Sequence, residues 1–223
     1  MSVESSDTLG RTLERLSAGL AAEEAAHYDL LDTTVRKLDQ RDVALASGTV
    51  APDFRLPSET GLSLSLAELL QNGPTLIVFA RGPWCPFCLA ELAAFREFSP
   101  QFHAAGLGIV AITPTVSGGA KTLRDELDLP FPVLCDVGSG VTLSFGCLFA
   151  LPEPAYQWLN DDQFSLAELF GDEGRFMLLP TCFGIDRDRT ILTVAGETDM
   201  RRFPAIEEIL GSFQAALAER QTN

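Results

Sequence analysis

Two uninterrupted apolar runs constrain the fold of this chain more than any other feature of its sequence. Residues 75–80 read TLIVFA and residues 106–113 read GLGIVAIT, and both are rich in β-branched side chains. Continuous apolar strands of this kind are typical of a parallel sheet that is covered on both faces. The segment between them, CLAELAAFREFSPQF (88–102), has apolar residues near helical spacing. A helix between two parallel strands makes a crossover connection, which is almost always right-handed.

The rest of the chain extends this alternation. KTLRDELDL (121–129) predicts a short helix, and FPVLCD (131–136) predicts a short strand. CFGIDRD (182–188) and TILTVAG (190–196) predict a β-hairpin, and AIEEILGSFQAALAER (205–220) predicts a final amphipathic helix. The sequence therefore predicts an α/β fold in which helices flank a central mixed β-sheet.

The N-terminal part of the chain carries a different, purely helical pattern. Leucines and other apolar residues recur there at helical spacing, namely Leu9, Leu13, Leu16 and Leu20, then Tyr28, Leu31, Val35 and Leu38. We expect a helical arm over residues 1–46 and a main domain over residues 47–223. The pattern leaves open whether the arm packs on its own domain or on a second subunit, as in a homodimer.

Residues 139–180 do not fit the simple alternation. They contain prolines, aromatic residues and one segment of helical character. We interpret them as an insertion that covers a site, because long insertions in compact domains are commonly functional. Trp158 and Phe164 in this insertion are either contacts for a partner or ordinary core residues.

Charge and apolar runs exclude some classes of partner. The net charge is -15 and the pI is near 4.4, which disfavours nucleic acid and anionic membranes as partners. No apolar run approaches the roughly 20 residues that span a bilayer, and the start of the chain lacks a signal-peptide pattern. We therefore expect a cytoplasmic protein.

The segment RGPWCPFCLAEL (81–92) holds the candidate chemistry. It follows the first apolar run and opens a predicted helix, so Cys85 should lie at the junction and Cys88 in the first helical turn. Free N–H groups and the helix dipole at such a junction stabilise a thiolate. Pro86 suits the first helical position, where a missing N–H costs little. One thiolate can then attack a substrate while the other thiol closes a disulfide.

Two alternatives exist for this pair of cysteines, namely a metal site and buried core thiols that share this spacing by accident. A zinc site requires two more ligands, but the remaining cysteines are scattered and His27 and His103 are the only histidines. The scattered cysteines lie in apolar stretches typical of core thiols, with Cys182 the least certain of Cys135, Cys147 and Cys182. We predict a redox-active pair with no metal and no organic cofactor, because sulfur carries the electrons.

The CxxC motif at a strand–helix junction resembles the thioredoxin fold. A wider likeness, over most of residues 45–210, is to the peroxiredoxins of the alkyl hydroperoxide reductase and thiol-specific antioxidant superfamily, especially a branch with an RGxWCPxC signature and a helical N-terminal arm. The likeness lies in the segments VAPDFRLPSETGLSLSLAELL, PTLIVFARGPWCPFCLAEL, GLGIVAITP, LPFPVLCD and LPTCFGIDRD. It implies a thioredoxin-like fold of the peroxiredoxin type.

The two resemblances assign the attacking sulfur differently. The peroxiredoxin motif, Pro-x-x-x-Thr-x-x-Cys, implies that Cys88 attacks, and then Cys85 stands at the threonine position and Arg81 at the proline position. The thioredoxin motif implies that Cys85 attacks and Cys88 resolves. The sequence leaves both possibilities open.

Other residues depart from the peroxiredoxin pattern. Peroxiredoxins have an arginine at the position of Pro180, where thioredoxins have a cis proline, so we expect a cis peptide bond before Pro180. Arg81 either replaces the lost charge or is a surface cation bound to a carbonyl group. Trp84 either lies flat beside the disulfide or covers the core. We expect Glu91 to be favourable at a helix start or simply exposed. Arg189 stands where relatives often have glycine, so we expect that hairpin turn to differ.

The resemblance implies an antioxidant, peroxiredoxin-like oxidoreductase that reduces peroxides through a CxxC thiol/disulfide cycle. An external thiol of the thioredoxin or glutathione type would then reduce the disulfide. The missing threonine and arginine favour an alternative, a thioredoxin- or glutaredoxin-like thiol–disulfide oxidoreductase. A non-catalytic redox-sensing or scaffold protein is a further alternative.

Overall fold

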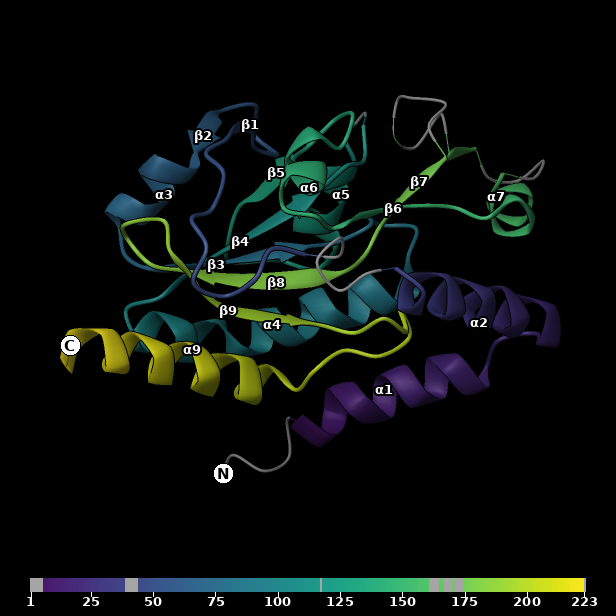
Figure 1. Ribbon diagram of the computed structural model, residues 1–223, viewed down its shortest axis with the longest axis horizontal. Helices are drawn as coiled ribbons and strands as arrows, with labels where there is room; N and C mark the ends of the chain where they lie inside the picture. The colour runs from purple at the N-terminus through teal and green to yellow at the C-terminus, as the bar shows by residue number, and fades with distance from the viewer. Residues whose placement is uncertain are drawn as a thin grey trace.

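A five-stranded mixed sheet forms the centre of the protein (Figure 1). The computed structural model describes residues 6–38, 44–116, 118–160, 165–166, 170 and 175–222. The strands of the central sheet are β3 (Thr75–Phe79), β4 (Gly108–Thr113), β5 (Val133–Cys135), β8 (Thr181–Ile185) and β9 (Ile191–Gly196). Their order is β5-β4-β3-β8-β9, in which β3, β4 and β5 are parallel and β8 is antiparallel to both β3 and β9. The predicted mixed sheet is confirmed.

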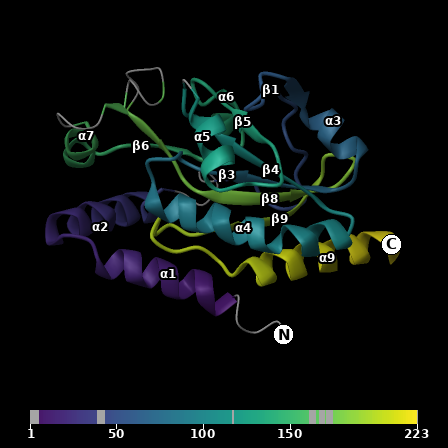
Figure 2. The same ribbon diagram turned by 180° about the vertical axis from the view of Figure 1, so that it is seen from behind.

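Helices cover both faces of this sheet. The crossover helix α4 (Pro86–Ala104) and the last helix, α9 (Ile206–Thr222), lie together on one face, and α3 (Leu66–Gln71) and α6 (Gly140–Ser144) lie on the other (Figures 1 and 2). Helix α5 (Gly119–Glu126) connects β4 to β5. In the part of the chain that the structure describes, no helix combines the length and apolarity needed to cross a membrane.

The position of strand β3 explains why its sequence is apolar from Leu76 to Phe79. All five of its residues are buried. Leu76 and Val78 point into the core under α4 and α9, whereas Ile77 and Phe79 point into the second core on the opposite face. Successive side chains point in opposite directions, so a strand buried on both faces favours apolar side chains at successive positions. The one polar side chain of β3, Thr75, donates its hydroxyl to Gly73 O at 3.1 Å.

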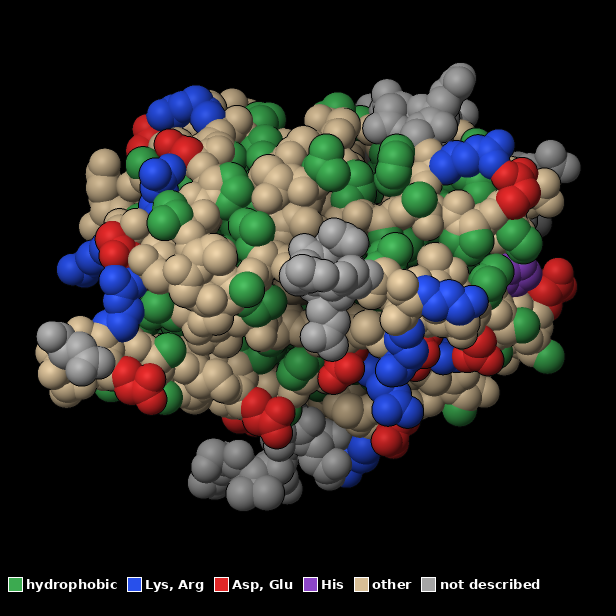
Figure 3. Space-filling model, in the orientation of Figure 1, with side chains coloured by type: hydrophobic (Ala, Val, Ile, Leu, Met, Phe, Trp, Pro, Cys, Tyr) green, Lys and Arg blue, Asp and Glu red, His purple; other side chains and the backbone are tan. Residues whose placement is uncertain are grey.

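The N-terminal helices are part of the larger core. Helix α1 (Ser6–Ala18) and helix α2 (Ala22–Arg36) extend the layer formed by α4 and α9. Five apolar residues of the arm are buried in the same cluster as the apolar face of α4, namely Leu9, Leu13, Tyr28, Leu31 and Val35. The arm therefore packs on its own chain. Opposite charges lie side by side on the outer surface of this region (Figure 3), where Arg36 pairs with Asp32 at 2.8 Å.

A short hairpin and helix before β3 were not predicted as separate elements. They are β1 (Arg55–Pro57), β2 (Ser63–Ser65) and α3. Helix α3 starts with a capping box, in which Glu68 N–H donates to Ser65 Oγ at 3.2 Å and Ser65 N–H donates to the Glu68 carboxylate at 2.7 Å. Serine followed by glutamate three residues later is a start signal that the sequence carries.

The predicted insertion, residues 139–180, contains regular structure. It includes α6, β6 (Leu148–Ala150), α7 (Glu153–Leu159) and β7 (Phe176–Leu178), and β6 pairs with β7 in an antiparallel ribbon. The expected helical character is confirmed by α6 and α7. Phe164 lies outside the described residues.

The turn between β8 and β9 places an arginine in a left-handed conformation. Arg189 has φ +69°, the left-handed conformation that glycine favours. Its N–H donates to Asp186 O at 2.9 Å, and Asp186 N–H donates to Thr190 O at 3.0 Å. Arginine therefore adopts the backbone conformation that glycine would take. That the turn differs from the turn of relatives stays a prediction.

Candidate active site

A tight turn after β3 brings the cysteine motif into position. Gly82 has φ +137°, and a Cβ atom there would lie 2.4 Å from Thr115 Cγ2. Cys85 N–H donates to Gly82 O at 3.2 Å, which closes a four-residue turn with Pro83 at its second position. Glycine is therefore required at position 82, and the turn delivers Cys85 directly to the start of α4.

The two cysteines lie where the sequence predicted. Cys85 is the N-cap residue of α4, Pro86 is the first helical residue and Cys88 is in the first turn. Cys88 N–H donates to Cys85 Sγ at 3.3 Å, so the sulfur takes the capping role that an oxygen usually has. Both cysteines are free thiols and fully buried.

The surroundings distinguish the two thiols. Burial raises the pKa of Cys85, but the hydrogen bond from the Cys88 thiol, the charge of Arg81 and the Cys88 N–H together outweigh it and lower that pKa to about 7. Burial raises the pKa of Cys88 well above its ordinary value, and the neighbouring Cys85 sulfur raises it further. A substantial fraction of Cys85 is therefore thiolate at neutral pH, while Cys88 keeps its proton.

Arg81 is the buried cation of this site. Only 1% of it is exposed, so the alternative of a surface cation is wrong. Its Nη2 donates to Met200 O at 3.3 Å and its Nη1 donates to Met200 Sδ at 3.2 Å, which confirms the expected carbonyl contact. Burial lowers its pKa, but the two cysteine sulfurs raise it above the ordinary value. None of the ion pairs among the described residues includes Arg81.

Aromatic side chains cover the site. The Arg81 guanidinium lies 5.8 Å from the centre of the Trp84 ring, and Phe170 meets Trp84 edge-on at 6.2 Å. Trp84 is half-buried, and its predicted contact with a disulfide stays a prediction. Because Phe170 comes from the segment interpreted as an insertion, that segment contributes to the cover.

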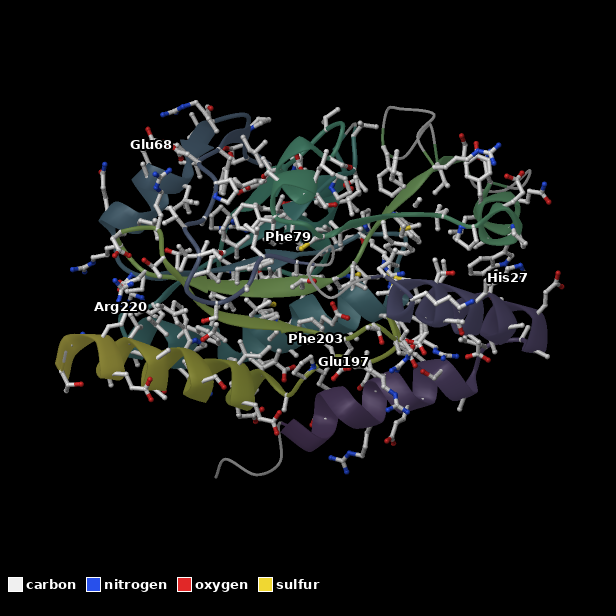
Figure 4. The ribbon with its side chains drawn as sticks, viewed as in Figure 1. His27, Glu68, Phe79, Glu197, Phe203 and Arg220 are labelled. Atoms are coloured by element: carbon white, nitrogen blue, oxygen red, sulfur yellow. The ribbon has the colours of Figure 1, made fainter. Side chains whose placement is uncertain are left out.

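A second group of rings lies over the start of α4. Tyr28 of α2 meets Phe87 at 5.3 Å and Trp158 at 5.8 Å, both edge-on, and His27 stacks on Trp158 at 4.6 Å. Figure 4 places His27 on α2 beside α7. We call these four residues, His27, Tyr28, Phe87 and Trp158, the aromatic cover. Trp158 thus packs within its own chain, and through these rings α2 and α7 meet beside the start of α4.

Glu91 departs most from what the sequence suggested. It is 1% exposed, whereas we expected a surface residue. Neither of its carboxyl oxygens has a hydrogen-bond partner in the part of the chain that the structure describes. Burial raises its pKa well above the ordinary value, the Cys88 sulfur raises it further, and Arg81 lowers it. A helical apolar stripe of Cys88, Leu92 and Phe95 includes position 91 at i+3 of Cys88, so the spacing could have revealed the burial.

The other cysteines differ in their distance from the site. Cys182 is buried on β8, where Val78 is its partner in the sheet, and the nearby Glu91 carboxyl raises its pKa further above a value that burial already raises. Burial raises the pKa of Cys147 to about 12. Cys135 is half-buried, and burial also raises its pKa. Cys182 is the one of these three that reaches the surroundings of Glu91.

Pro180 does not have the geometry that we expected. The described residues contain no cis peptide bond, so the bond before Pro180 is trans. Pro180 leads directly into β8, where Thr181 pairs with Phe79 at the end of β3. The residue is therefore near the start of the cysteine turn, but without the cis bond that thioredoxins have.

Among the described residues, no group of three or more histidine, cysteine or acidic side chains is arranged to hold a metal ion. The charged groups near the sulfurs are instead one arginine and one carboxyl group, Arg81 and Glu91.

Comparison with known proteins agrees with this geometry. Residues 47–194 match the model of the AhpC/TSA family. Over 102 residues the chain is 32% identical to a putative peroxiredoxin of Mycobacterium tuberculosis, covering 46% of this chain and 64% of that protein. It is 26% identical to a chloroplastic peroxiredoxin Q of Triticum aestivum over 46% of each chain. The chain thus spans less than two thirds of the length of these relatives.

Solved structures show the same fold. The structure of peroxidoxin BcpB from Mycobacterium tuberculosis matches with a TM-score of 0.59 and 23% identity, covering 78% of this chain and 97% of that one. A yeast mitochondrial 1-Cys peroxiredoxin matches with a TM-score of 0.63 and 14% identity, covering 79% and 78%. The predicted thioredoxin-like fold of the peroxiredoxin type is confirmed.

Proposed function

The chain belongs to the AhpC/TSA family, and from this premise we propose that it is a thiol-dependent peroxidase that uses Cys85 and Cys88. The observation that carries the proposal is the free pair of thiols at the start of α4, of which one has a pKa of about 7 beside a buried arginine. A low-pKa thiolate next to a cation is the form of sulfur that attacks an oxidised substrate.

The proposed cycle begins at Cys85. Its thiolate attacks the terminal peroxide oxygen and the O–O bond breaks, so that this oxygen and its proton stay on sulfur. The other oxygen leaves as an alkoxide or hydroxide and takes one proton from an acid beside the site or from water, giving an alcohol or water. The resulting Cys85 sulfenic acid is attacked by the Cys88 sulfur, water is released and a Cys85–Cys88 disulfide forms. The Cys88 pKa supports its role as the second reactant, because that sulfur stays protonated until the sulfenic acid is present.

Burial supports a small substrate. Both cysteines are fully covered, partly by the rings of the aromatic cover and by Trp84. A hydroperoxide has to bring only two oxygen atoms to Cys85, whereas a protein disulfide has to bring its backbone as well. The second candidate, thiol–disulfide exchange, is favoured by the Cys85 N-cap geometry, which matches the order of attack in thioredoxins.

The cycle requires an external reductant. We propose a thiol of the thioredoxin or glutathione type, which attacks the disulfide and returns both cysteines to the reduced form. Such a cycle fits a reducing compartment such as the cytoplasm, where thiol donors are maintained. A homodimer stays a proposal, and gel filtration with light scattering would measure it.

Peroxide consumption with a thiol donor tests the proposal. We expect the protein to consume hydrogen peroxide or an alkyl hydroperoxide with thioredoxin or glutathione present, and to leave insulin disulfides unreduced. Cys85→Ser should abolish turnover, while Cys88→Ser should accumulate a sulfenic acid on Cys85 that a dimedone probe labels. Cys135→Ser is the matched control, because this half-buried thiol lies outside the site.

Three results would contradict the proposal. Insulin reduction without peroxide consumption would establish the disulfide exchanger. Unchanged peroxide turnover in Cys85→Ser would remove the assigned nucleophile. Absence of both activities, in protein that forms no Cys85–Cys88 disulfide, would leave a sensor or scaffold.

A further inference from the structure

Glu91 is a buried carboxyl group that the proposed cycle has not yet used. It lies three residues after Cys88 on α4, so the two side chains share one face of the helix. Glu91 is 1% exposed, and both of its oxygens are without hydrogen-bond partners in the described residues. Burying a carboxyl group without partners is costly. A group held in this way calls for an explanation at the site rather than in the packing of the core.

The ionisable groups around Glu91 come from three elements. Cys88 and Cys85 lie on its own helix, Arg81 on the turn after β3 and Cys182 on β8. Arg81 is the only cation among them. The Arg81 Nε atom also has no hydrogen-bond partner among the described residues. One buried positive charge is therefore shared by two acidic groups, Cys85 and Glu91.

Tyr28 completes this environment from α2. Burial raises its pKa to about 12, so it stays neutral and supplies no charge to the site. The charge balance thus depends on Arg81, Cys85 and Glu91. A buried charge is stable only when an opposite charge compensates it.

The balance changes with the redox state. In the reduced protein, the Cys85 thiolate compensates Arg81, and a second negative charge on Glu91 would be unbalanced. In the disulfide form, the charge of Cys85 is gone, and Arg81 would be a lone buried cation unless Glu91 ionised. The charge of Arg81 is balanced in both redox states only if one negative charge lies beside it in each. Glu91 therefore has to be protonated when the cysteines are reduced and ionised when they form a disulfide.

We propose that Glu91 is the proton store of the Cys85–Cys88 pair. Glu91 gives up one proton when the two cysteines are oxidised to a disulfide and takes one proton up again when the disulfide is reduced. This inference rests on the proposed disulfide cycle. In the oxidative half, Cys85–S⁻, Cys88–SH, Glu91–COOH and ROOH give the disulfide, Glu91–COO⁻, ROH and water. In the reductive half, the disulfide, Glu91–COO⁻ and a dithiol give Cys85–S⁻, Cys88–SH, Glu91–COOH and the oxidised dithiol. Atoms and charge balance in each half without a proton from solvent.

Counting protons tests this proposal directly. Reduced protein in weakly buffered solution at pH 8, with a pH-indicator dye, is oxidised with one equivalent of hydrogen peroxide, and mass spectrometry verifies the disulfide. We expect the wild type to take up no proton from solvent. Glu91→Gln should take up one proton for each disulfide formed, because the store is missing. Glu97→Gln is the matched control, since it removes an exposed carboxylate from the same helix and should behave as the wild type.

The reverse half provides a second count. Protein oxidised chemically to the disulfide is reduced with dithiothreitol, and we expect no proton release in the wild type and one proton released in Glu91→Gln. This arm works even if peroxide is not the substrate, so failure of the proposed function and failure of the proton store are distinguishable. Equal proton counts in the wild type and in Glu91→Gln, with the disulfide formed in both, would overturn the proton store.

Infrared difference spectra of the wild type cover the case in which Glu91→Gln does not fold. Oxidation of the wild type should remove a band of a protonated carboxylic acid and add carboxylate absorption. Reduction should restore the first band. A spectrum in which no carboxyl band changes between the two redox states would also overturn the proposal.

Discussion

Two arginine–carboxyl groupings of this protein differ in the way their charges are compensated. At the buried corner, Arg81 and Glu91 lie near each other without an ion pair, and both keep polar atoms without hydrogen-bond partners among the described residues. At the edge between α2 and β9, Arg201 donates to Asp199 at 2.8 Å and to Asp29 at 2.7 Å. At the edge, the charge of Arg201 is balanced by aspartates that are already paired with it. At the corner, the charge of Arg81 is balanced only when the Cys85 sulfur or the Glu91 carboxyl group ionises.

This difference indicates that the two groupings have different roles, one in structure and one in the chemistry of the site. The edge fastens the arm to the main domain, and Thr198 Oγ1 adds a bond to Asp32 at 2.8 Å. Burial opposes ionisation of Asp199, but its hydrogen bonds with Arg201 outweigh this and lower its pKa, whereas the pKa of Glu91 is raised. Their contributions to stability should therefore depend on pH with opposite signs.

The largest expected effect is the pH dependence of Glu91→Gln. A raised pKa in the folded state means that folded Glu91 keeps a proton which the unfolded chain releases above its ordinary pKa near 4.3. The contribution of Glu91 to stability is therefore present below that pH and is lost as pH rises. Between pH 5 and pH 7, reduced Glu91→Gln should gain up to about 3 kcal/mol relative to the wild type. Urea unfolding at both values measures this.

Parallel pH profiles for Glu91→Gln and the wild type would mean that Glu91 is ionised in the reduced fold. Arg81 would then be balanced by a permanently ionised carboxylate, as Arg201 is at the edge. Glu97→Gln again serves as the control, because the carboxylate it removes is exposed.

The next effect concerns the charge of Arg81. Arg81→Met keeps much of the side-chain volume but removes the cation that lowers the pKa of Cys85. The hydrogen bonds from Cys88 remain, so the pKa of Cys85 should rise from about 7 toward the ordinary value of about 8.5, at which the thiolate fraction at pH 7 is about 3% instead of about half. Alkylation of Cys85 by iodoacetamide should slow by up to about 15-fold at pH 7 and much less at pH 9. Peptide mass spectrometry follows the modification of this cysteine.

Arg201→Met is the counterpart at the edge and should leave the alkylation profile of Cys85 unchanged. If both arginine variants slowed alkylation equally, a general loss of structure would explain the effect, and Arg81 would have no special role. If neither did, the hydrogen bonds from the Cys88 thiol and N–H would set the pKa of Cys85 without Arg81.

The contrast between corner and edge also separates what the sequence could predict from what it could not. The apolar runs at β3 and β4 determined the sheet, and the position of Pro86 after Cys85 determined the start of α4. These are local patterns. Burial of Glu91 and Arg81 depends on how α4 packs against β8 and on the segment around Met200, far away in the sequence. A polar residue in an apolar stripe carries a local signal, but its missing partners become visible only in three dimensions.

Pro180 and Arg189 illustrate the same limit for backbone geometry. Position in a family pattern suggested a cis bond before Pro180, and this expectation was wrong, while Arg189 has a left-handed backbone. Backbone conformation at such positions is imposed by the elements on either side. In Arg189 the hairpin between β8 and β9 overrides the preference of the residue.

A smaller effect is expected at the edge itself. Asp199→Asn should remove the charge that Arg201 binds and lower stability at pH 7 by on the order of 1 kcal/mol. A lowered pKa means that the contribution of Asp199 is present above its ordinary value near 3.9 and is lost as pH falls through the folded-state pKa. The difference between variant and wild type should therefore disappear at strongly acidic pH. A difference that grew on acidification would contradict the assigned ion pair.

The smallest effect should come from Arg189→Gly in the hairpin turn. Arginine at φ +69° carries a left-handed backbone cost that glycine avoids, although glycine also gains freedom in the unfolded chain. The Arg189 carbonyl accepts from Ala51 N–H at 2.8 Å, and glycine retains this bond because it involves only the backbone. Stability should rise by about 0.5–1 kcal/mol with no change in the reactivity of Cys85. A loss of stability would mean that the Arg189 side chain stabilises the fold by more than its left-handed backbone costs. Arg189 would then have a structural role like that of Arg201.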